Sequence, residues 1–200
     1  NYRNINNMPI QKQETQIISE LHLFMGCMFA GKSTELLRQY KINQQRFRNK
    51  NDILIINHAA DTRYAEEGKS VVSTHNKEQL ESQSVSCLKT LQESEEYIQS
   101  KVILIDEAQF FTGLYDFVIK AVEDDNKIVY VFGLDADSDR KSFGELLQLI
   151  PMATTYQKLF AKCDCGADAI HTKRIVESNE QMLVGSQDSY IPVCRRCYNK

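Results

Sequence analysis

The stretch Gly26-Cys27-Met28-Phe29-Ala30-Gly31-Lys32-Ser33 decides the fold of this chain. It has the pattern G-x-x-x-x-G-K-[ST], whose glycines let the backbone curl so that its N–H groups point at phosphate oxygens. The apolar run 21–25 precedes it, and a helical pattern over about 34–50 follows it. Strand, glycine loop and helix in this order are the context that the motif requires. The stretch therefore predicts a phosphate-binding loop.

Each part of this loop has an expected role toward a nucleotide. The ammonium group of Lys32 can reach the β- and γ-phosphates, and the hydroxyl group of Ser33 can bind Mg²⁺. The N-terminus of the following helix adds a partial positive charge. The expected cofactor-binding residues of the loop are Gly26, Cys27, Met28, Phe29, Ala30, Gly31, Lys32, Ser33 and Thr34.

The composition is that of a globular protein that can bury a core. Of its 200 residues, 42% are hydrophobic and 26% are charged. The formal net charge of −3 argues against a dedicated nucleic-acid binder, which is usually basic. The sequence lacks an apolar run near the ~20 residues of a membrane span and lacks a secretory signal pattern. We therefore expect a cytoplasmic protein without nucleic-acid or membrane partners.

Short apolar runs bounded by polar residues predict strands that are buried on both faces of a parallel sheet. Strands are predicted at 20–25, 52–57, 101–107 and 127–134, with shorter candidates at 71–73 and 85–87. Helices are predicted at 34–50, 88–100, 114–122 and 143–150, the last of them stopped by Pro151. Strands that alternate with helices predict an α/β fold, a parallel sheet with helices on both faces.

The chain is expected to divide into three parts. Residues 1–18 are polar and lack periodicity, which predicts a mobile N-terminal tail. Residues 19–161 carry the alternating pattern and the phosphate loop, so they are predicted to form the ATP-binding domain. Four of the six cysteines lie after Ala161, where the periodicity weakens, and residues 162–200 are therefore predicted to form a small module held by metal.

A second group of chemical residues follows the apolar run 102–105. Asp106 is placed as the carboxylate that holds Mg²⁺ in phosphate-loop proteins, and Glu107 can take a proton from an attacking hydroxyl group or water. Arg63 is the candidate cation that neutralises charge on the transferring group. The alternatives are a solvated strand end and a surface arginine. The carboxylates also suit an ATPase or a helicase, although a helicase usually needs a second motor domain.

The last four cysteines have spacings that suit zinc. Cys194 and Cys197 have two residues between them, and Cys163 and Cys165 have one, followed by Gly166, which eases a tight turn. Four thiolates suit a tetrahedral Zn²⁺ site whose role is structural, because no position is left for a substrate. Unpaired thiols are the alternative, and His171 is a substitute ligand if Cys163 cannot reach.

Five motifs occur in one order in this chain. They are Gly26-x-Met28-Phe29-x-Gly31-Lys32-Ser33-Thr34-Glu35-Leu36, Asp61-Thr62-Arg63-Tyr64, Asp106-Glu107-Ala108-Gln109-Phe110-Phe111, Thr172-Lys173-Arg174 and Cys194-x-x-Cys197. Together they resemble the type II thymidine kinases, cytosolic enzymes with a zinc-held lasso loop. The resemblance covers the chain from about Leu21 to Tyr198.

The resemblance implies a fold and an activity. The fold is a P-loop NTPase-like (RecA-like) parallel sheet with helices on both faces, plus a small zinc-ribbon or lasso domain. The activity is transfer of the γ-phosphate of ATP to the 5′-hydroxyl group of thymidine, and of deoxyuridine in some members. The product, dTMP, serves nucleotide salvage and DNA synthesis. Members of the family are commonly homotetramers, which is the basis for expecting one here.

The resemblance also implies roles for individual residues. Glu107 is the base, Lys32 and Arg63 hold and neutralise the phosphates, and Ser33 and Asp106 hold Mg²⁺. The further ATP-binding residues are Asp61, Thr62 and Gln109. The thymidine-binding residues are Met28, Phe111, Leu134, Ser138, Phe143, Thr172, Gln181, Met182, Leu183, Val184, Gly185 and Tyr190. The lasso backbone over 182–185 would hydrogen-bond the base, and Tyr190 would close over it.

Three positions depart from the family pattern. Cys27 stands where proline is usual, Ser138 stands where an aromatic residue is usual, and the pair Cys163 and Cys165 is one residue closer than expected. The alternative function is a P-loop ATPase switch or binding module whose structural zinc loop grips a partner. That alternative predicts ATP hydrolysis without any nucleoside.

Overall fold

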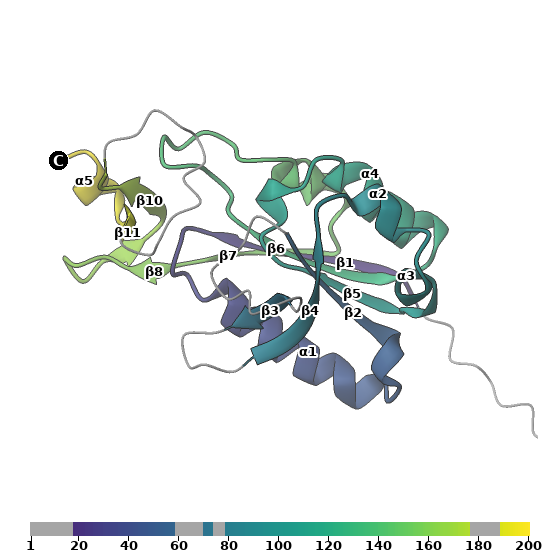
Figure 1. The fold of residues 1–200 in the computed structure, drawn as a ribbon. Helices are drawn as coiled ribbons and strands as arrows, with labels where there is room; N and C mark the ends of the chain where they lie inside the picture. The colour runs from purple at the N-terminus through teal and green to yellow at the C-terminus, as the bar shows by residue number, and fades with distance from the viewer. Residues whose placement is uncertain (1–17, 59–69, 74–78, 177–188) are drawn as a thin grey trace, which may run out of the picture.

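The computed structural model describes residues 18–58, 70–73, 79–176 and 189–200, with no side chains described at 70–73 and 79. Its centre is a seven-stranded sheet with the strand order β3-β4-β2-β5-β6-β1-β7 (Figure 1). All neighbouring strands are parallel except β3 and β4, which are antiparallel. The predicted α/β class is confirmed.

The strands of this sheet are β1 (Glu20–Gly26), β2 (Ile53–His58), β3 (Ser70–Ser73), β4 (Gln79–Val85), β5 (Val102–Ile105), β6 (Ile128–Gly133) and β7 (Thr155–Leu159). The helices are α1 (Lys32–Arg46), α2 (Leu88–Leu91), α3 (Glu95–Gln99) and α4 (Leu114–Ile119), the last continuing into the π turn η3 (Lys120–Asp124). The short 3₁₀ turns are η1 (Lys50–Asp52), η2 (Ala108–Phe110) and η4 (Leu146–Met152).

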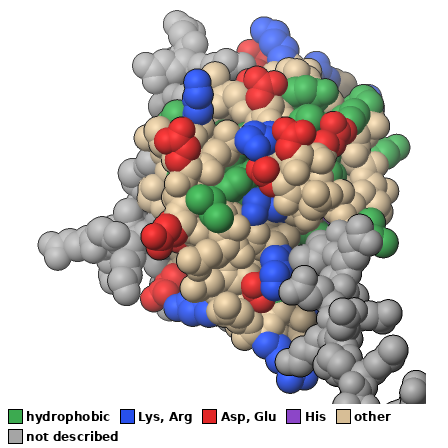
Figure 2. Space-filling view, turned by 90° about the vertical axis from the view of Figure 1, so that its right-hand side faces the viewer, with side chains coloured by type: hydrophobic (Ala, Val, Ile, Leu, Met, Phe, Trp, Pro, Cys, Tyr) green, Lys and Arg blue, Asp and Glu red, His purple; other side chains and the backbone are tan. Residues whose placement is uncertain are grey.

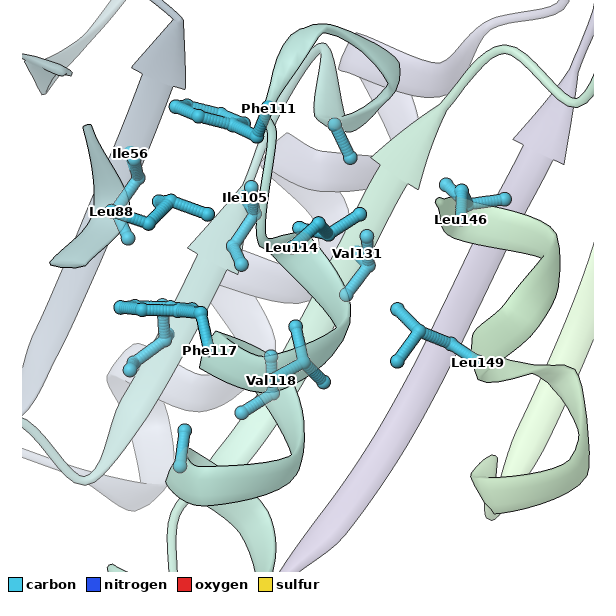
Figure 3. Close-up of a cluster of buried hydrophobic side chains, with 14 of the residues drawn as sticks. Ile56, Leu88, Ile105, Phe111, Leu114, Phe117, Val118, Val131, Leu146 and Leu149 are labelled. Carbon is cyan, nitrogen blue, oxygen red and sulfur yellow. The ribbon is translucent and has the colours of Figure 1, made fainter. Parts of the chain in front are cut away.

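Alternate residues of the central strands face two separate cores, one on each side of the sheet. In β5, Ile103 and Ile105 pack with α2, α4 and η4 in the larger core shown in Figure 3. Val102 and Leu104 face the other way, into a core that includes Leu36 of α1. Because both faces of these strands are covered, their sequence is a continuous apolar run.

Several predicted boundaries are wrong. The helix predicted over 34–50 ends at Arg46, since the chain turns extended at Phe47, whose ring is buried. The helix predicted over 88–100 is two short helices, α2 and α3, because Ser94 caps a new start at the N–H of Tyr97. The strand predicted at 85–87 is the longer β4, which ends at Val85.

The helix predicted over 143–150 is the 3₁₀ element η4, and Pro151 lies inside it instead of stopping it. In η4, the N–H group of Gln148 donates to the carbonyl group of Glu145, and the N–H group of Ala153 donates to that of Ile150. Pro151, which has no N–H group, lies between these two donors. β7 was not predicted, because its side chains at the sheet edge are mostly exposed and leave no apolar run.

The C-terminal residues form a small module beyond the end of β7 (Figure 1). Two antiparallel pairs, β8 (Ala161–Lys162) with β9 (Asp168–Ala169) and β10 (His171–Arg174) with β11 (Tyr190–Val193), are followed by α5 (Arg195–Tyr198). The division of the chain at residues 161 and 162 stays a prediction, and most of the predicted tail over 1–18 lies outside the described residues. No helix in the described ranges has the length and apolar character needed to cross a membrane.

The opposite end of the molecule, near α3, carries a buried lysine. The side chain of Lys127 donates hydrogen bonds to the carbonyl groups of Tyr97 (2.7 Å) and Ser100 (2.6 Å) and lies 4.5 Å from the ring centre of Tyr97. The hydroxyl group of Tyr97 donates to Asp125. Burial lowers the pKa of Lys127. The network joins the end of α3 to the start of β6. On the face of the molecule that Figure 2 shows, acidic and basic side chains are mixed.

We expect Lys127→Met to lower the free energy of unfolding by about 3 kcal/mol, because it leaves buried carbonyl groups without their donor. Urea denaturation followed by circular dichroism would measure the change. Lys89→Met is the matched control, since Lys89 is exposed, and it should change stability by less than about 0.5 kcal/mol. Equal stability of the two variants would show that the network contributes nothing.

Candidate active site and metal centre

The parallel strands bring the predicted catalytic elements to one edge of the sheet. β6 lies between β5 and β1, and Ile105 is in register with Val131, which is in register with Leu23. Asp106 therefore lies two strand spacings, about 10 Å, from the strand that leads into the phosphate loop. A bound phosphate group and its cation can bridge such a span.

The phosphate loop connects β1 to α1 through two special backbone positions. Gly31 has the left-handed conformation (φ 82°) that starts α1, and its carbonyl group accepts from the N–H group of Glu35. A Cβ atom on Gly26 would collide with the carbonyl oxygen of Leu159 in β7. Glycine at this position therefore allows the close pairing of β1 with β7 next to the loop.

Lys32 folds back over its own loop. Its side chain is 9% exposed, and its ammonium group donates to the carbonyl oxygens of Gly26 (3.3 Å) and Cys27 (2.9 Å). The cation therefore lies inside the curve of the loop, where an incoming phosphate would replace the carbonyl groups as its partner.

Gln109 holds the carboxylate of Glu107 and the chain after β6 together. Its amide group is 3% exposed and donates to Glu107 (2.6 Å), while its oxygen accepts from the N–H group of Leu134 (2.9 Å). Glu107 is half-buried and has a left-handed backbone (φ 49°). The buried carboxylate of Asp106 accepts from the N–H group of Glu107 (3.0 Å) and so supports this turn.

The predicted nucleoside residues after β6 lie on this edge of the sheet. Leu134, Ser138 and Phe143 are half-buried, and the Phe143 ring meets Phe110 edge to face with centres 5.6 Å apart. Phe111 is instead 2% exposed and packs in the larger core. The structure therefore brings Phe110, which is not among the predicted site residues, to the position beside Phe143.

Two hydrogen bonds join the phosphate loop to the C-terminal module. The N–H group of Met28 donates to the hydroxyl group of Thr172 (3.0 Å), and the thiol of Cys27 donates to the carbonyl oxygen of Ala169 (3.3 Å). Cys27 is 2% exposed, and burial raises the pKa of its thiol. The predicted base contact Thr172 is thus itself buried against the loop.

The four C-terminal cysteines converge. The sulfur atoms of Cys163, Cys165, Cys194 and Cys197 all lie within 4.8 Å of one another. Two of these separations are 3.5 Å and 3.6 Å, and zinc with four bonds of about 2.3 Å in a tetrahedron would place its sulfur ligands about 3.8 Å apart. The short first pair therefore reaches the cluster, and His171 is not part of it.

The backbone around the cluster favours thiolates at three of its four cysteines. Hydrogen bonding by backbone N–H groups lowers the pKa of the thiols of Cys163, Cys165 and Cys194. Hydrogen bonding with the other three sulfur atoms raises the pKa of Cys197 to about 12. Gly166 has a left-handed conformation (φ 85°) and donates to the carbonyl oxygen of Cys163, which closes the tight turn of the first pair. The donor set and its backbone support fit a zinc ion.

Other predicted site residues lie outside the described residues. They are Asp61, Thr62, Arg63, Gln181, Met182, Leu183, Val184 and Gly185. Tyr190, at the start of β11, is 8% exposed, and the guanidinium group of Arg174 lies 5.5 Å from its ring centre. No local sequence pattern marks Tyr198 as a functional residue. Its hydroxyl group donates to the carbonyl oxygen of Ser138, and 60 residues separate the two partners.

Comparisons with known proteins agree with this geometry. The sequence profile of the family described as thymidine kinase matches residues 19–198. The chain is 39% identical over 183 residues to a thymidine kinase of Oryza sativa subsp. japonica, covering 90% of this chain and 66% of that protein. It is 41% identical to thymidine kinase a of Arabidopsis thaliana, covering 89% of this chain and 74% of that protein. It is 37% identical to the cytosolic thymidine kinase of Homo sapiens, covering 90% and 74%. Because the family profile spans almost the whole sequence, this chain belongs to the thymidine kinase family.

Proposed function

We propose that this chain is an ATP-dependent kinase that transfers the γ-phosphate of ATP to the 5′-hydroxyl group of thymidine, giving dTMP for nucleotide salvage. The observation that carries the proposal is the carboxylate of Glu107, held by Gln109 at the sheet edge that also carries the phosphate loop. Membership of the thymidine kinase family supports the same reaction.

The phosphates of ATP would bind in the loop from Gly26 to Thr34. Lys32 would exchange its two carbonyl partners for phosphate oxygens and so hold the transferring group. The hydroxyl group of Ser33 and the carboxylate of Asp106 are hard oxygen ligands that suit Mg²⁺, which would neutralise phosphate charge when bound. Arg63, with Asp61 and Thr62, is proposed to add positive charge and contacts to the bound phosphates.

Glu107 would accept the proton of the 5′-hydroxyl group as that oxygen attacks the γ-phosphate. The hydrogen bond from Gln109 fixes the direction of its carboxylate. Gln109 also accepts a hydrogen bond from the N–H group of Leu134. The same residue therefore holds both the proton acceptor Glu107 and the nucleoside side of the site. This arrangement would position the proton acceptor relative to the sugar before the reaction begins.

The thymine base is proposed to bind among Met28, Leu134, Phe143 and Thr172. Phe110 replaces Phe111 as the proposed aromatic contact, since Phe110 faces Phe143 while Phe111 is buried in the core. Ser138, Tyr190 and the lasso residues 181–185 would form the rest of the binding site for the base. Backbone groups that pair with base edges would select thymine, because a wrong base leaves them unpaired.

We also propose that Cys163, Cys165, Cys194 and Cys197 hold a structural zinc ion that closes the segment between the two pairs. The sulfur separations support this assignment. The location is proposed to be the cytosol, because the similar proteins from Gallus gallus and Homo sapiens are named cytosolic. A homotetramer is proposed from the resemblance alone, and light scattering coupled to gel filtration would measure it.

Incubation with Mg-ATP and each deoxynucleoside in turn should give ADP release that depends on thymidine. Glu107→Gln should reduce kcat by roughly 10²- to 10⁴-fold, because the proton acceptor is lost, and should leave ATP affinity within about twofold. Glu93→Gln, at an exposed position, is the matched control and should keep full turnover. ADP release without any nucleoside would support the ATPase switch instead, and full turnover by Glu107→Gln would rule out its role as base.

Removal of zinc should expose the thiol of Cys27, since this thiol packs in a small core with Ala169, Val193 and Cys194. We expect alkylation of Cys27 and of the four cluster cysteines to be slow in the zinc-loaded protein and fast after chelation, as measured by mass spectrometry of labelled peptides. Cys87 is exposed and should react equally in both states, which makes it the internal control. Cluster cysteines that react equally with and without the chelator would refute the zinc site.

A further inference from the structure

The chain after β6 forms a compact loop over 134–142. The carboxylate of Asp137 accepts from the N–H groups of Asp139 and Lys141, both at 2.9 Å, and Ala136 bridges to Ser142. Asp139, Arg140 and Lys141 are exposed. The loop is therefore well closed internally, while its tip depends on outside contacts for its place in the molecule.

Tyr198 of α5 provides such a contact from the metal module. Its hydroxyl group donates to the carbonyl oxygen of Ser138 (2.6 Å), and the guanidinium group of Arg140 lies 4.2 Å from its ring centre. Arg140 also donates to the side chain of Asn199 (3.2 Å). The loop tip is thus held by a hydrogen bond, a cation–π contact and a second hydrogen bond, all from residues 198 and 199.

Tyr198 is in turn fixed by the metal module. It directly follows the zinc ligand Cys197, and its N–H group donates to the carbonyl oxygen of Cys194 (2.9 Å). The side chain of Lys173 donates to the carbonyl oxygens of Cys197 (3.4 Å) and Tyr198 (3.2 Å), which ties α5 to β10. The ring of Tyr198 therefore has a fixed position relative to the cysteine cluster.

We propose that Tyr198 is a positioning residue that fixes the loop over 134–142 to the cysteine cluster and so sets the nucleoside side of the site. The inference rests on the proposed function, because Leu134 and Ser138 are proposed to contact the nucleoside. Leu134 is held at its own N–H group by Gln109, while the carbonyl oxygen of Ser138 is held by Tyr198. Gln109, which holds Glu107, and Tyr198 of the metal module thus hold opposite parts of one loop. This loop extends toward β10 and α5 in Figure 1.

The test uses the full-length zinc-loaded chain with Tyr198→Phe, which removes the hydroxyl group and keeps the ring. Amide hydrogen exchange of peptides over 134–142, measured without ligand, should become several-fold faster. The KM for thymidine should rise roughly 2- to 10-fold, the range expected for one lost hydrogen bond, while kcat and the KM for ATP stay within about twofold. The zinc content should stay unchanged.

Two further variants sharpen this experiment. Arg140→Asn removes the cation–π contact with Tyr198 and the hydrogen bond to Asn199, so it should show the same signature. Asparagine tolerates the left-handed conformation of this position (φ 66°). Tyr156→Phe, at a 63% exposed tyrosine of β7, is the matched control and should change neither loop exchange nor any kinetic constant.

Unchanged loop exchange in Tyr198→Phe would overturn the inference. Loss of zinc with an equal rise of both KM values would also overturn it, because this result would show a general structural role. The exchange measurement needs no substrate. If the chain phosphorylates no nucleoside, the proposed function is refuted, but hydrogen exchange still tests whether Tyr198 positions the loop.

Discussion

The parallel alignment of β5, β6 and β1 is the constraint on which the rest of the molecule depends. Parallel strands end at the same edge of a sheet, so the turn after β5 and the loop after β1 must face the same side. The intervening strand β6 sets their separation and continues into the loop over 134–142. A single geometric feature thus brings together the residues proposed for phosphate binding, proton transfer and base recognition, although these residues are far apart in sequence.

The small C-terminal module is more than an appendage to this sheet. It bonds the phosphate loop through Thr172 and Ala169 and bonds the loop after β6 through Tyr198. The proposed zinc ion would cross-link four sulfur ligands and so stiffen a segment that is too short to bury a large core of its own.

The departures from the family pattern have local explanations. The thiol of Cys27 reaches the carbonyl oxygen of Ala169, a hydrogen bond that a proline at this position could not donate. The short spacing of Cys163 and Cys165 is accommodated by the left-handed turn at Gly166. At Ser138, the backbone carbonyl oxygen accepts a hydrogen bond from the hydroxyl group of Tyr198.

The sequence by itself determined the elements whose signals are local: the glycine loop, the apolar strand that leads to Asp106 and Glu107, and the spaced cysteines. A glycine pattern or an apolar run encodes a backbone conformation within a few residues, so it can be recognised without knowing its neighbours. Only the tertiary structure decided that β7 lies at the sheet edge, that Phe110 and not Phe111 faces Phe143, and that Tyr198 reaches Ser138. These outcomes depend on the order of the strands and on contacts across long stretches of chain, which side-chain periodicity does not specify.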